Sequence, residues 1–444
     1  MNMTSQLQLL TLSNGHGEDV IAVRILKELL QLENSPKISA LPLVGEGYAY
    51  QELNIPIVGS VKTMPSGGFI YMDGGQQLMR DVQGGLLKLT LNQIQTTREW
   101  VKAQKQAGNR SAVLAVGDIL PLLFASISGA NYAFVGTAKS EYYVRDDGGL
   151  LKRTNKGAYW ENFSGSIYHP WERWLMTRRR CKAIFPRDSL TTTILQEMRV
   201  PVFDLGNPMM DNLQPSFPTH RIYATDTEHQ EIIRPLVVTL LPGSRTPEAY
   251  DNWEEIMIGV SSLMETMLER NPVSHGSKIL IFLGAIAPNL DSHILAQFVT
   301  SQGWKPHPIA ELPVKFSDDK ALTFKQRNAY FVLAQNAYND CLHMADIAIA
   351  MAGTATEQFV GLGKPAFTIP GKGPQFNPVF AEAQSRLLGN SVILVPRAEN
   401  LGKQVKNLLA DPDKLHAIAE NGLLRMGKPG AAQRIAECIM ERLG

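Results

Sequence analysis

One local pattern recurs along the chain, and it restricts the possible folds more than any other feature. A short run of apolar residues ends in a glycine-containing turn, and apolar residues at helical spacing follow. In the first half this pattern starts at residues 7–12, 112–116 and 132–135. Uninterrupted apolar runs are typical of strands buried on both faces. Because such strands alternate with helices, the pattern predicts an open parallel sheet flanked by helices.

The second half repeats the pattern. Strands are predicted at residues 236–241, 279–283, 346–350 and 365–369, and helices at residues 251–270 and from Glu357 onward. A chain of 444 residues is too long for one ordinary core, so we expect two domains of about 200 residues each. The predicted fold class is α/β, with two Rossmann-like, doubly wound parallel-sheet domains that face a central cleft.

The domain boundary is predicted where the chain becomes polar and irregular. Prolines at positions 215 and 218 follow the segment Gly206-Asn-Pro-Met-Met-Asp211, as is typical of a linker. We therefore expect an N-terminal domain at residues 1–213, a linker at 214–235, a C-terminal domain at 236–428 and a final segment at 429–444.

Composition argues against several classes of protein. Lys and Arg total 43 against 42 Asp and Glu, so the whole chain has no field that would attract nucleic acid. The three cysteines are far apart and not in metal-ligand spacing, so we expect neither a disulfide framework nor a metal site, and a cytoplasmic location. Signal-peptide and membrane-span patterns are lacking, so any membrane contact is expected to be peripheral.

Two loops of the second half have the composition of a phosphate site. Gly243-Ser244-Arg245 offers backbone N–H groups beside a cation, and Gly353-Thr354-Ala355-Thr356 offers two hydroxyls at a predicted helix N-terminus. Together these loops could hold a diphosphate, with Glu357 accepting hydrogen bonds from ribose hydroxyls. In the alternative interpretation, Glu357 complements the helix dipole and a threonine caps the helix.

The order of these loops resembles a known family. The chain is similar to lipid-A-disaccharide synthase, a glycosyltransferase of the GT-B fold, in three segments that follow one another in the sequence. They are Gly206-Asn-Pro-Met-Met-Asp211, Pro242-Gly-Ser-Arg245 and Ala352-Gly-Thr-Ala-Thr-Glu357. The resemblance implies a UDP-sugar donor in the C-terminal domain, a lipid acceptor in the N-terminal domain and a last helix that crosses back to the N-terminal domain. It also implies that Gln375 and Asn377 lie near the donor sugar, although both could be polar surface of a loop.

The first glycine-rich loop differs from the family pattern. The synthases have Gly-Glu-x-Ser-Gly-Asp, whereas this chain has Asn14-Gly15-His16-Gly17-Glu18-Asp19. Glycosyl transfer with inversion needs a base for the proton of the acceptor hydroxyl, and the candidates are His16 and Asp118. His16 could instead be a turn histidine, and Asp118 could be the N-cap of a helix at residues 119–126. Glu18 and Asp19 are interpreted as partners of the helix dipole.

The acceptor side is predicted from three further segments. Gly15 and Gly17 belong to the loop expected at the acceptor. Trp171 and Trp174, near Arg178 and Arg179, would suit a membrane interface, although tryptophans at helical spacing also pack into cores. The glycine-rich segment 65–75 could grip a lipid or be a surface loop without a role.

These features predict an inverting, metal-independent glycosyltransferase of glycolipid biosynthesis. Its donor would be a nucleotide sugar, with UDP expected, and it would need no other cofactor. No Asp-x-Asp pair lies in the donor loops, and Arg245 with a helix dipole would neutralise the diphosphate instead. Two alternatives remain: a nucleotide-sugar epimerase on the same fold, and a catalytically silent protein that binds sugar nucleotides.

Overall fold

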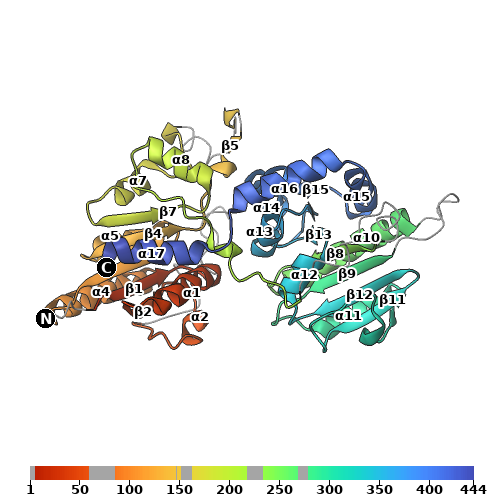
Figure 1. Ribbon diagram of the computed structural model, residues 1–444, viewed down its shortest axis with the longest axis horizontal. Helices are drawn as coiled ribbons and strands as arrows, with labels where there is room; N and C mark the ends of the chain where they lie inside the picture. Colours follow the sequence, from red (N-terminus) through yellow and green to blue (C-terminus); the bar gives the residue numbers. More distant parts are fainter. Residues whose placement is uncertain (1–5, 60–85, 147, 152–162, 218–233, 269–278) are drawn as a thin grey trace. The chain divides into compact units, whose positions relative to one another are not determined.

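The apolar runs of the sequence form the strands of two separate sheets (Figure 1). The computed structural model describes residues 6–59, 86–146, 148–151, 163–217, 234–268 and 279–444. The chain divides into a first unit, residues 1–211 with 427–444, and a second unit, residues 212–426. The glycine-rich segment 65–75 and most of the predicted linker lie outside the described residues.

The described residues of the first unit form a main sheet of five parallel strands in the order β2-β1-β3-β4-β7. Its strands are β1 (Gln8–Ser13), β2 (Lys37–Pro42), β3 (Ser111–Gly117), β4 (Asn131–Gly136) and β7 (Cys181–Phe185). The strand order reverses between β1 and β3, which is the topological switch point where doubly wound folds bind ligands. A separate antiparallel pair consists of β5 (Arg145–Asp146) and β6 (Gly149–Leu150).

Helices cover both faces of this sheet. Leu9 and Leu114 share a core with α1 and α17 on one face, and Val113 shares a core with α4, α5, α7 and α8 on the other. Asp118 and Asp188 begin α5 and α8, because each side chain accepts a backbone N–H of the first turn. The helices are α1 (His16–Gln31), α2 (Tyr48–Gln51), α4 (Leu86–Gln106), α5 (Ile119–Ile127), α7 (Pro170–Met176), α8 (Ser189–Glu197) and α17 (Ala431–Leu443).

The last helix of the chain belongs to the first unit. In Figure 1 the blue helix α17 lies among the elements built from the first half of the chain, and it packs against α1. Asp211 caps it: Oδ2 accepts from Ala432 N at 2.7 Å, and Oδ1 accepts from Ala431 N at 3.2 Å. A carboxylate at this position also complements the positive end of the helix dipole.

In the described part of the second unit, the sheet has eight strands in the order β10-β11-β12-β9-β8-β13-β14-β15. The six strands from β12 to β15 in this order are parallel, and their switch point lies between β8 and β13. The strands are β8 (Leu236–Leu241), β9 (Leu280–Ala285), β10 (Lys305–Pro306), β11 (Leu322–Gln326), β12 (Ala329–Ala334), β13 (Ile347–Ala350), β14 (Ala366–Thr368) and β15 (Val392–Leu394).

One large core supports this sheet. It joins alternate strand residues such as Val238 and Phe282 to Trp253 of α10 and Leu401 of α15. The helices α12 and α13 contact β8, β9, β13 and β14. The helices of the unit are α10 (Glu248–Leu268), α11 (Ser292–Ser301), α12 (Tyr338–Met344), α13 (Thr354–Gly361), α14 (Pro378–Leu388), α15 (Leu401–Leu409) and α16 (Pro412–Met426).

The predicted fold class is confirmed as α/β with two Rossmann-like units. Two details differ from the prediction. The antiparallel strands β10 and β11 form an edge that the sequence pattern did not indicate. The helix expected from Glu357 begins at Thr354, because Gly353 already serves as its N-cap and the first turn contains Glu357.

Candidate functional site

The loops that follow β8 and β13 lie next to each other at the switch point of the second sheet. Gly243 has a positive φ of 92°, and a Cβ atom there would lie 3.4 Å from the carbonyl oxygen of Met351. Gly353 follows at the N-terminus of α13. A glycine in each loop therefore brings exposed backbone and a helix N-terminus to one place, as phosphate sites require.

Two buried amide side chains hold these loops in position. Nδ2 of Asn252 donates to Pro242 O at 3.0 Å and to Met351 O at 3.3 Å. Nε2 of Gln384 donates to Ala352 O at 3.0 Å. The sequence analysis missed both residues; their signal is a polar amide among the mainly apolar residues on the buried face of each helix.

The predicted phosphate-binding residues differ in what they can offer. Ser244, Arg245 and Thr354 are exposed, and Ala355 is partly exposed in the first turn of α13. Thr356 is fully buried, and its hydroxyl donates to Ala352 O at 2.6 Å, so that it supports the helix turn. Glu357 is 9% exposed at the same end of α13.

The loop before α14 is fixed by a buried carboxylate. Oε1 of Glu248 accepts from Gln375 N at 3.1 Å and from Phe376 N at 2.5 Å. Oδ1 of Asn377 accepts from Phe380 N at 2.9 Å and caps α14. The side chain of Asn377 therefore caps the helix, whereas Gln375 contacts Glu248 through its backbone N–H and not through its side chain.

At the switch point of the first sheet, Gly117 is packed against the end of β1. A Cβ atom on Gly117 would lie 1.9 Å from Oδ1 of Asn14 and 3.3 Å from Cγ of Glu18. Its φ is 135°, so only glycine fits this position without strain. Asn14 is 5% exposed, and its Oδ1 has no hydrogen-bond partner among the described residues.

Asp118 follows Gly117 directly. Its Oδ1 accepts from Leu120 N at 2.9 Å and caps α5, as the alternative interpretation of this residue expected. Burial, and secondarily the charge of Glu18, raises the pKa of the Asp118 carboxyl from 3.8 to about 6, while Lys139 opposes the rise. Only Oδ1 of Asp118 accepts the capping hydrogen bond, so Oδ2 could accept a proton, and the cap is compatible with a catalytic role.

A second carboxyl lies behind this edge. Ser13 Oγ donates to Oδ1 of Asp19 at 2.5 Å and shares a hydrogen bond of 2.6 Å with the Tyr50 hydroxyl. All three side chains are buried. Burial is the main reason that the pKa of Asp19 rises from 3.8 to about 7, and the charge of Glu18 adds to the rise. The sequence analysis assigned Asp19 only to the helix dipole and missed this network.

The end of β4 adds further polar groups to the edge. The Thr137 hydroxyl donates to Glu18 Oε1 at 3.3 Å. Lys139 forms a buried ion pair with Glu172, with Nζ 2.6 Å from Oε2. His16, the other candidate base, is the first residue of α1 and has an exposed side chain between Gly15 and Gly17.

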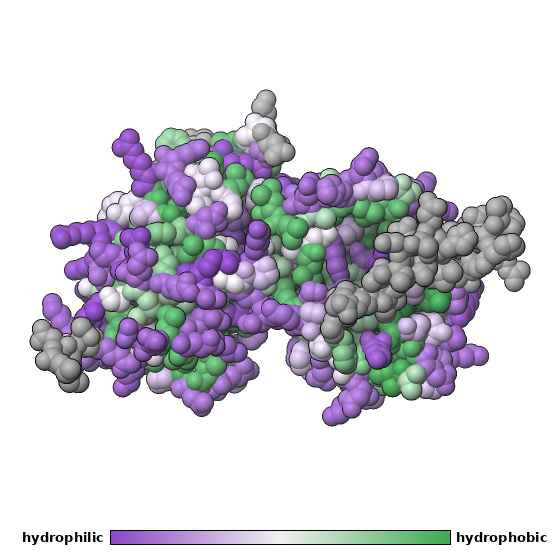
Figure 2. Space-filling view, viewed as in Figure 1, coloured by the Kyte–Doolittle hydropathy of each residue, from purple (hydrophilic) through white to green (hydrophobic). Residues whose placement is uncertain are grey.

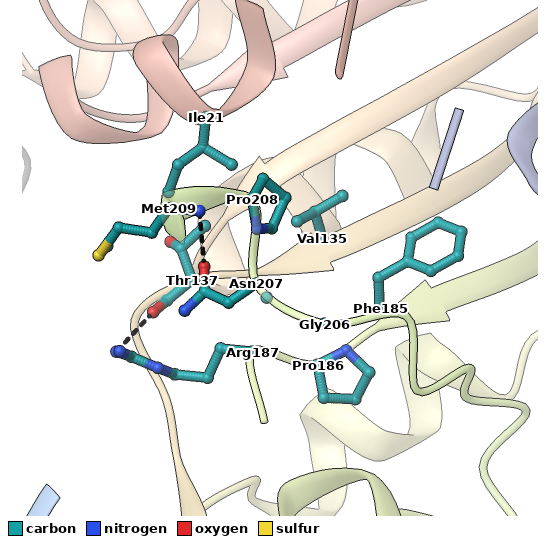
Figure 3. A pocket seen from close by; sticks show the side chains of 11 residues that line it. Ile21, Val135, Thr137, Phe185, Pro186, Arg187, Gly206, Asn207, Pro208 and Met209 are labelled. Atoms are coloured by element: carbon teal, nitrogen blue, oxygen red, sulfur yellow. Dashed lines mark hydrogen bonds between the residues drawn. The ribbon is translucent and has the colours of Figure 1, made fainter. Parts of the chain in front are cut away.

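A small pocket lies at the carboxyl ends of β4 and β7 (Figure 3). It has room for about one water molecule. Nη1 of Arg187 donates to Thr137 O at 3.1 Å, and Asn207 Oδ1 accepts from Met209 N at 3.0 Å. Figure 3 shows Ile21, Val135 and Pro208 on its apolar side.

The tryptophans of α7 lie at the surface of the first unit. Trp171 is 49% exposed and Trp174 is 59% exposed, so the interpretation that they pack into the core is wrong. The Arg178 guanidinium lies 4.4 Å from the centre of the Trp174 ring, and Arg179 is exposed beside it. The neighbouring helix α5 adds the part-exposed side chains Leu123 and Ile127. On the face drawn in Figure 2, hydrophobic residues lie in groups among hydrophilic ones.

The described residues contain neither a candidate membrane-spanning helix nor a candidate metal site. No helix in the described ranges is long and apolar enough to cross a membrane. Within the same ranges, no group of three or more His, Cys, Asp and Glu side chains is arranged to hold a metal ion.

Comparison with solved structures identifies the fold as GT-B. The calicheamicin glycosyltransferase CalG4 matches with a TM-score of 0.55 and 13% identity, over 100% of this chain and 99% of CalG4. MurG from Acinetobacter baumannii matches with a TM-score of 0.53 and 14% identity, over 98% of this chain and 99% of MurG. A UDP-N-acetylglucosamine 2-epimerase matches with a TM-score of 0.50 and 13% identity, over 98% of this chain and 96% of the epimerase. No family model matches the chain, and no curated protein matches it.

Proposed function

We propose that the chain is an inverting, metal-independent glycosyltransferase that moves a sugar from a UDP-sugar to a lipid or glycolipid. The observation that carries this proposal is that one GT-B chain has two sites of different chemistry, one in each unit. The second unit has a glycine-rich edge whose loops carry Arg245 and the N-terminus of α13, and the first unit has a carboxyl with a raised pKa at the carboxyl edge of its own sheet. The first suits a diphosphate, and the second suits proton transfer.

The donor half of the proposal uses the second unit. Ser244, Arg245 and the N-terminus of α13 at Thr354 bind the diphosphate, and their charge complementarity stabilises it as it leaves. Glu357 accepts from the ribose hydroxyls, and Gln375 contacts the sugar. Thr356 and Asn377 are assigned to loop structure, because their side chains are already bound within it.

The catalytic half uses Asp118 as the base. The oxygen of the acceptor hydroxyl forms a bond to the anomeric carbon, and the bond from that carbon to the diphosphate oxygen breaks. UDP leaves with the electron pair of that bond, and the hydroxyl proton passes to the Asp118 carboxylate. A pKa of about 6 leaves this base ionised at neutral pH and close to the pH at which it works best. His16 remains the second candidate for this role.

The surface around Trp171 and Trp174 supports a lipid acceptor. Exposed tryptophans beside arginines match a membrane interface, where rings lie at headgroup level and cations meet lipid phosphates. We propose that this surface holds the protein against a bilayer. Flotation with anionic lipid vesicles checks it: wild-type protein should float with the vesicles, and the double variant Trp171→Gln, Trp174→Gln should stay in solution. Equal flotation of both proteins would remove the surface from the proposal.

A nucleotide-sugar epimerase is the second candidate, because the epimerase fold matches over 98% of this chain. The two candidates share a donor site and differ in their need for an acceptor.

Calorimetric titration with UDP and a panel of nucleotide sugars tests the shared donor site. Selective binding of a UDP-sugar is expected, and no binding of any nucleotide would overturn both candidates. Incubation of the bound UDP-sugar without an acceptor then separates them, because an epimerase produces the epimer and a glycosyltransferase does not.

A further inference from the structure

The N-terminus of α1 lies at a switch point, and its own first turn carries carboxylates. A helix N-terminus is an anion site in many proteins, because its free N–H groups carry partial positive charge. Here Glu18 and Asp19 occupy the first turn, and Asp118 lies at the end of the neighbouring strand. The positive end of this helix is therefore offset by carboxylates of the protein itself.

Among the described residues near this edge, the cations Lys139 and Arg187 are already engaged by the protein. Lys139 is paired with the buried carboxylate of Glu172, and Arg187 donates to the carbonyl of Thr137. Burial is the main cause of the raised pKa values of Asp19 and Asp118, and the negative charge of Glu18 adds to the rise of both. Added negative charge at this edge would meet the same repulsion.

The edge also holds a hydrogen-bond acceptor without a donor. Asn14 Oδ1 is buried against Gly117, and no described residue donates to it. Carboxylates and an amide oxygen accept hydrogen bonds, so their complement is a group that donates them. Hydroxyls donate, whereas an ionised phosphate only accepts.

We propose that the edge formed by Asn14, Glu18 and Asp118 binds an uncharged polyol, the sugar or glycerol headgroup of a neutral lipid, and disfavours headgroups that carry phosphate. This inference rests on the proposed glycosyl transfer, since it names the class of acceptor for that reaction. The glycosidic bond forms to one of the headgroup hydroxyls, and the proton passes to Asp118 as described above.

Two lipids with ring polyols and matched acyl chains test the inference. Monohexosyl diacylglycerol has an uncharged headgroup, and phosphatidylinositol adds a phosphate. With the UDP-sugar identified by calorimetry, kcat/KM should be at least about tenfold higher for the neutral lipid, because like charge disfavours the phosphate. Glu18→Gln removes one negative charge but keeps a side chain that can accept a hydrogen bond from Thr137. It should raise kcat/KM for phosphatidylinositol and so reduce the ratio of kcat/KM between the neutral lipid and phosphatidylinositol. Equal or better use of phosphatidylinositol by the wild-type protein would overturn the inference.

A binding measurement decides the matter if neither lipid is glycosylated. Saturation-transfer NMR compares octyl glucoside, octyl phosphate and octylammonium below their micelle-forming concentrations, with UDP present. The inference expects octyl glucoside to bind, with a weaker signal in Asp118→Asn. Preference for octyl phosphate or octylammonium, or no binding of octyl glucoside, overturns it. Calorimetry distinguishes failure of the proposed function from failure of this inference, because a protein without that function would bind no nucleotide.

Discussion

The carboxyl edges of the two sheets present different chemistry on the same strand-turn-helix frame. In the first unit the switch point carries the carboxyl groups of Glu18 and Asp118, and the buried carboxyl of Asp19 lies behind them. In the second unit it carries the cation of Arg245 and the hydroxyl of Thr354. Each edge includes a helix that starts directly after a glycine. The side chains of the first turn and the neighbouring loop, and not the backbone frame, therefore decide which ligand charge each edge favours.

The comparison assigns proton transfer to one edge and phosphate binding to the other. Separate edges can be changed independently, because substitutions that share no partner act additively. A substitution at one edge should therefore change the property assigned to that edge and leave the property assigned to the other edge unchanged.

The largest effect is expected for Asp118→Asn. Asparagine also caps helices well, so α5 should persist while the base is lost. The rate of transfer should fall by about 10²–10⁴-fold, with UDP affinity unchanged. In the wild-type protein, kcat/KM should fall as the pH drops below about 6, because the Asp118 carboxyl with its raised pKa becomes protonated. Kinetics across pH and calorimetry with UDP measure both properties.

His16→Gln is the matched variant for that experiment. If Asp118 is the base, this variant should retain most of the activity and the same pH profile. A loss in His16→Gln as large as that expected for Asp118→Asn, with Asp118→Asn still active, would move the base to His16.

A second effect concerns the stability of the first unit. The folded protein raises the pKa of Asp19 from 3.8 to about 7, so its contribution to stability is fully present below pH 4 and is lost as the pH rises to 7. The loss is of the order of a few kcal/mol. Asp19→Asn should therefore gain stability relative to the wild type between pH 4 and pH 7. Chemical unfolding of both proteins across this range measures the difference, and a constant difference would contradict the prediction.

Glu357→Ala tests the opposite edge. Loss of the charge-assisted hydrogen bonds to ribose should weaken UDP binding by roughly 1.5–3 kcal/mol. The pH dependence of transfer at saturating donor should keep its position, since that belongs to Asp118. Unchanged UDP affinity would reject the ribose role of Glu357.

The loops of the second edge could be predicted from sequence, whereas the cluster of the first edge could not. Gly243 and Gly353 follow apolar runs, and such punctuation is a local signal. The contact of Asn14 with Gly117 needs β1 and β3 to be neighbours across about a hundred residues of sequence, and nothing local specifies that pairing. Asp19 was therefore interpreted from its helix position alone.

The sequence spacing of the two tryptophans of α7 also did not predict whether their side chains are exposed. Trp171 and Trp174 are three residues apart, which places them on one face of a helix but does not say which face is buried. The structure decides this because α7 buries Glu172, Leu175 and Met176 instead. The short antiparallel strand β11 (Leu322–Gln326) mixes polar and apolar residues, so its sequence gave no clear strand pattern.

The smallest effect is expected for Gln384→Met, which keeps the size of the side chain and removes the amide that holds Ala352 O. A buried carbonyl left without its donor costs about 1–3 kcal/mol, and part of this should appear as several-fold weaker UDP binding because the α13 loop is less ordered. Gln93→Met is the control: Gln93 of the first unit is as deeply buried as Gln384, and its Nε2 donates to Leu43 O at 3.0 Å, a carbonyl that belongs to neither the β8 loop nor the β13 loop. Both variants should lose similar stability in chemical unfolding, but only Gln384→Met should weaken UDP binding. Equal UDP affinity in the two variants would show that the ordering of the loop before α13 does not limit phosphate binding. The charge of Arg245 would then be the feature that makes the second edge, and not the first, favour phosphate.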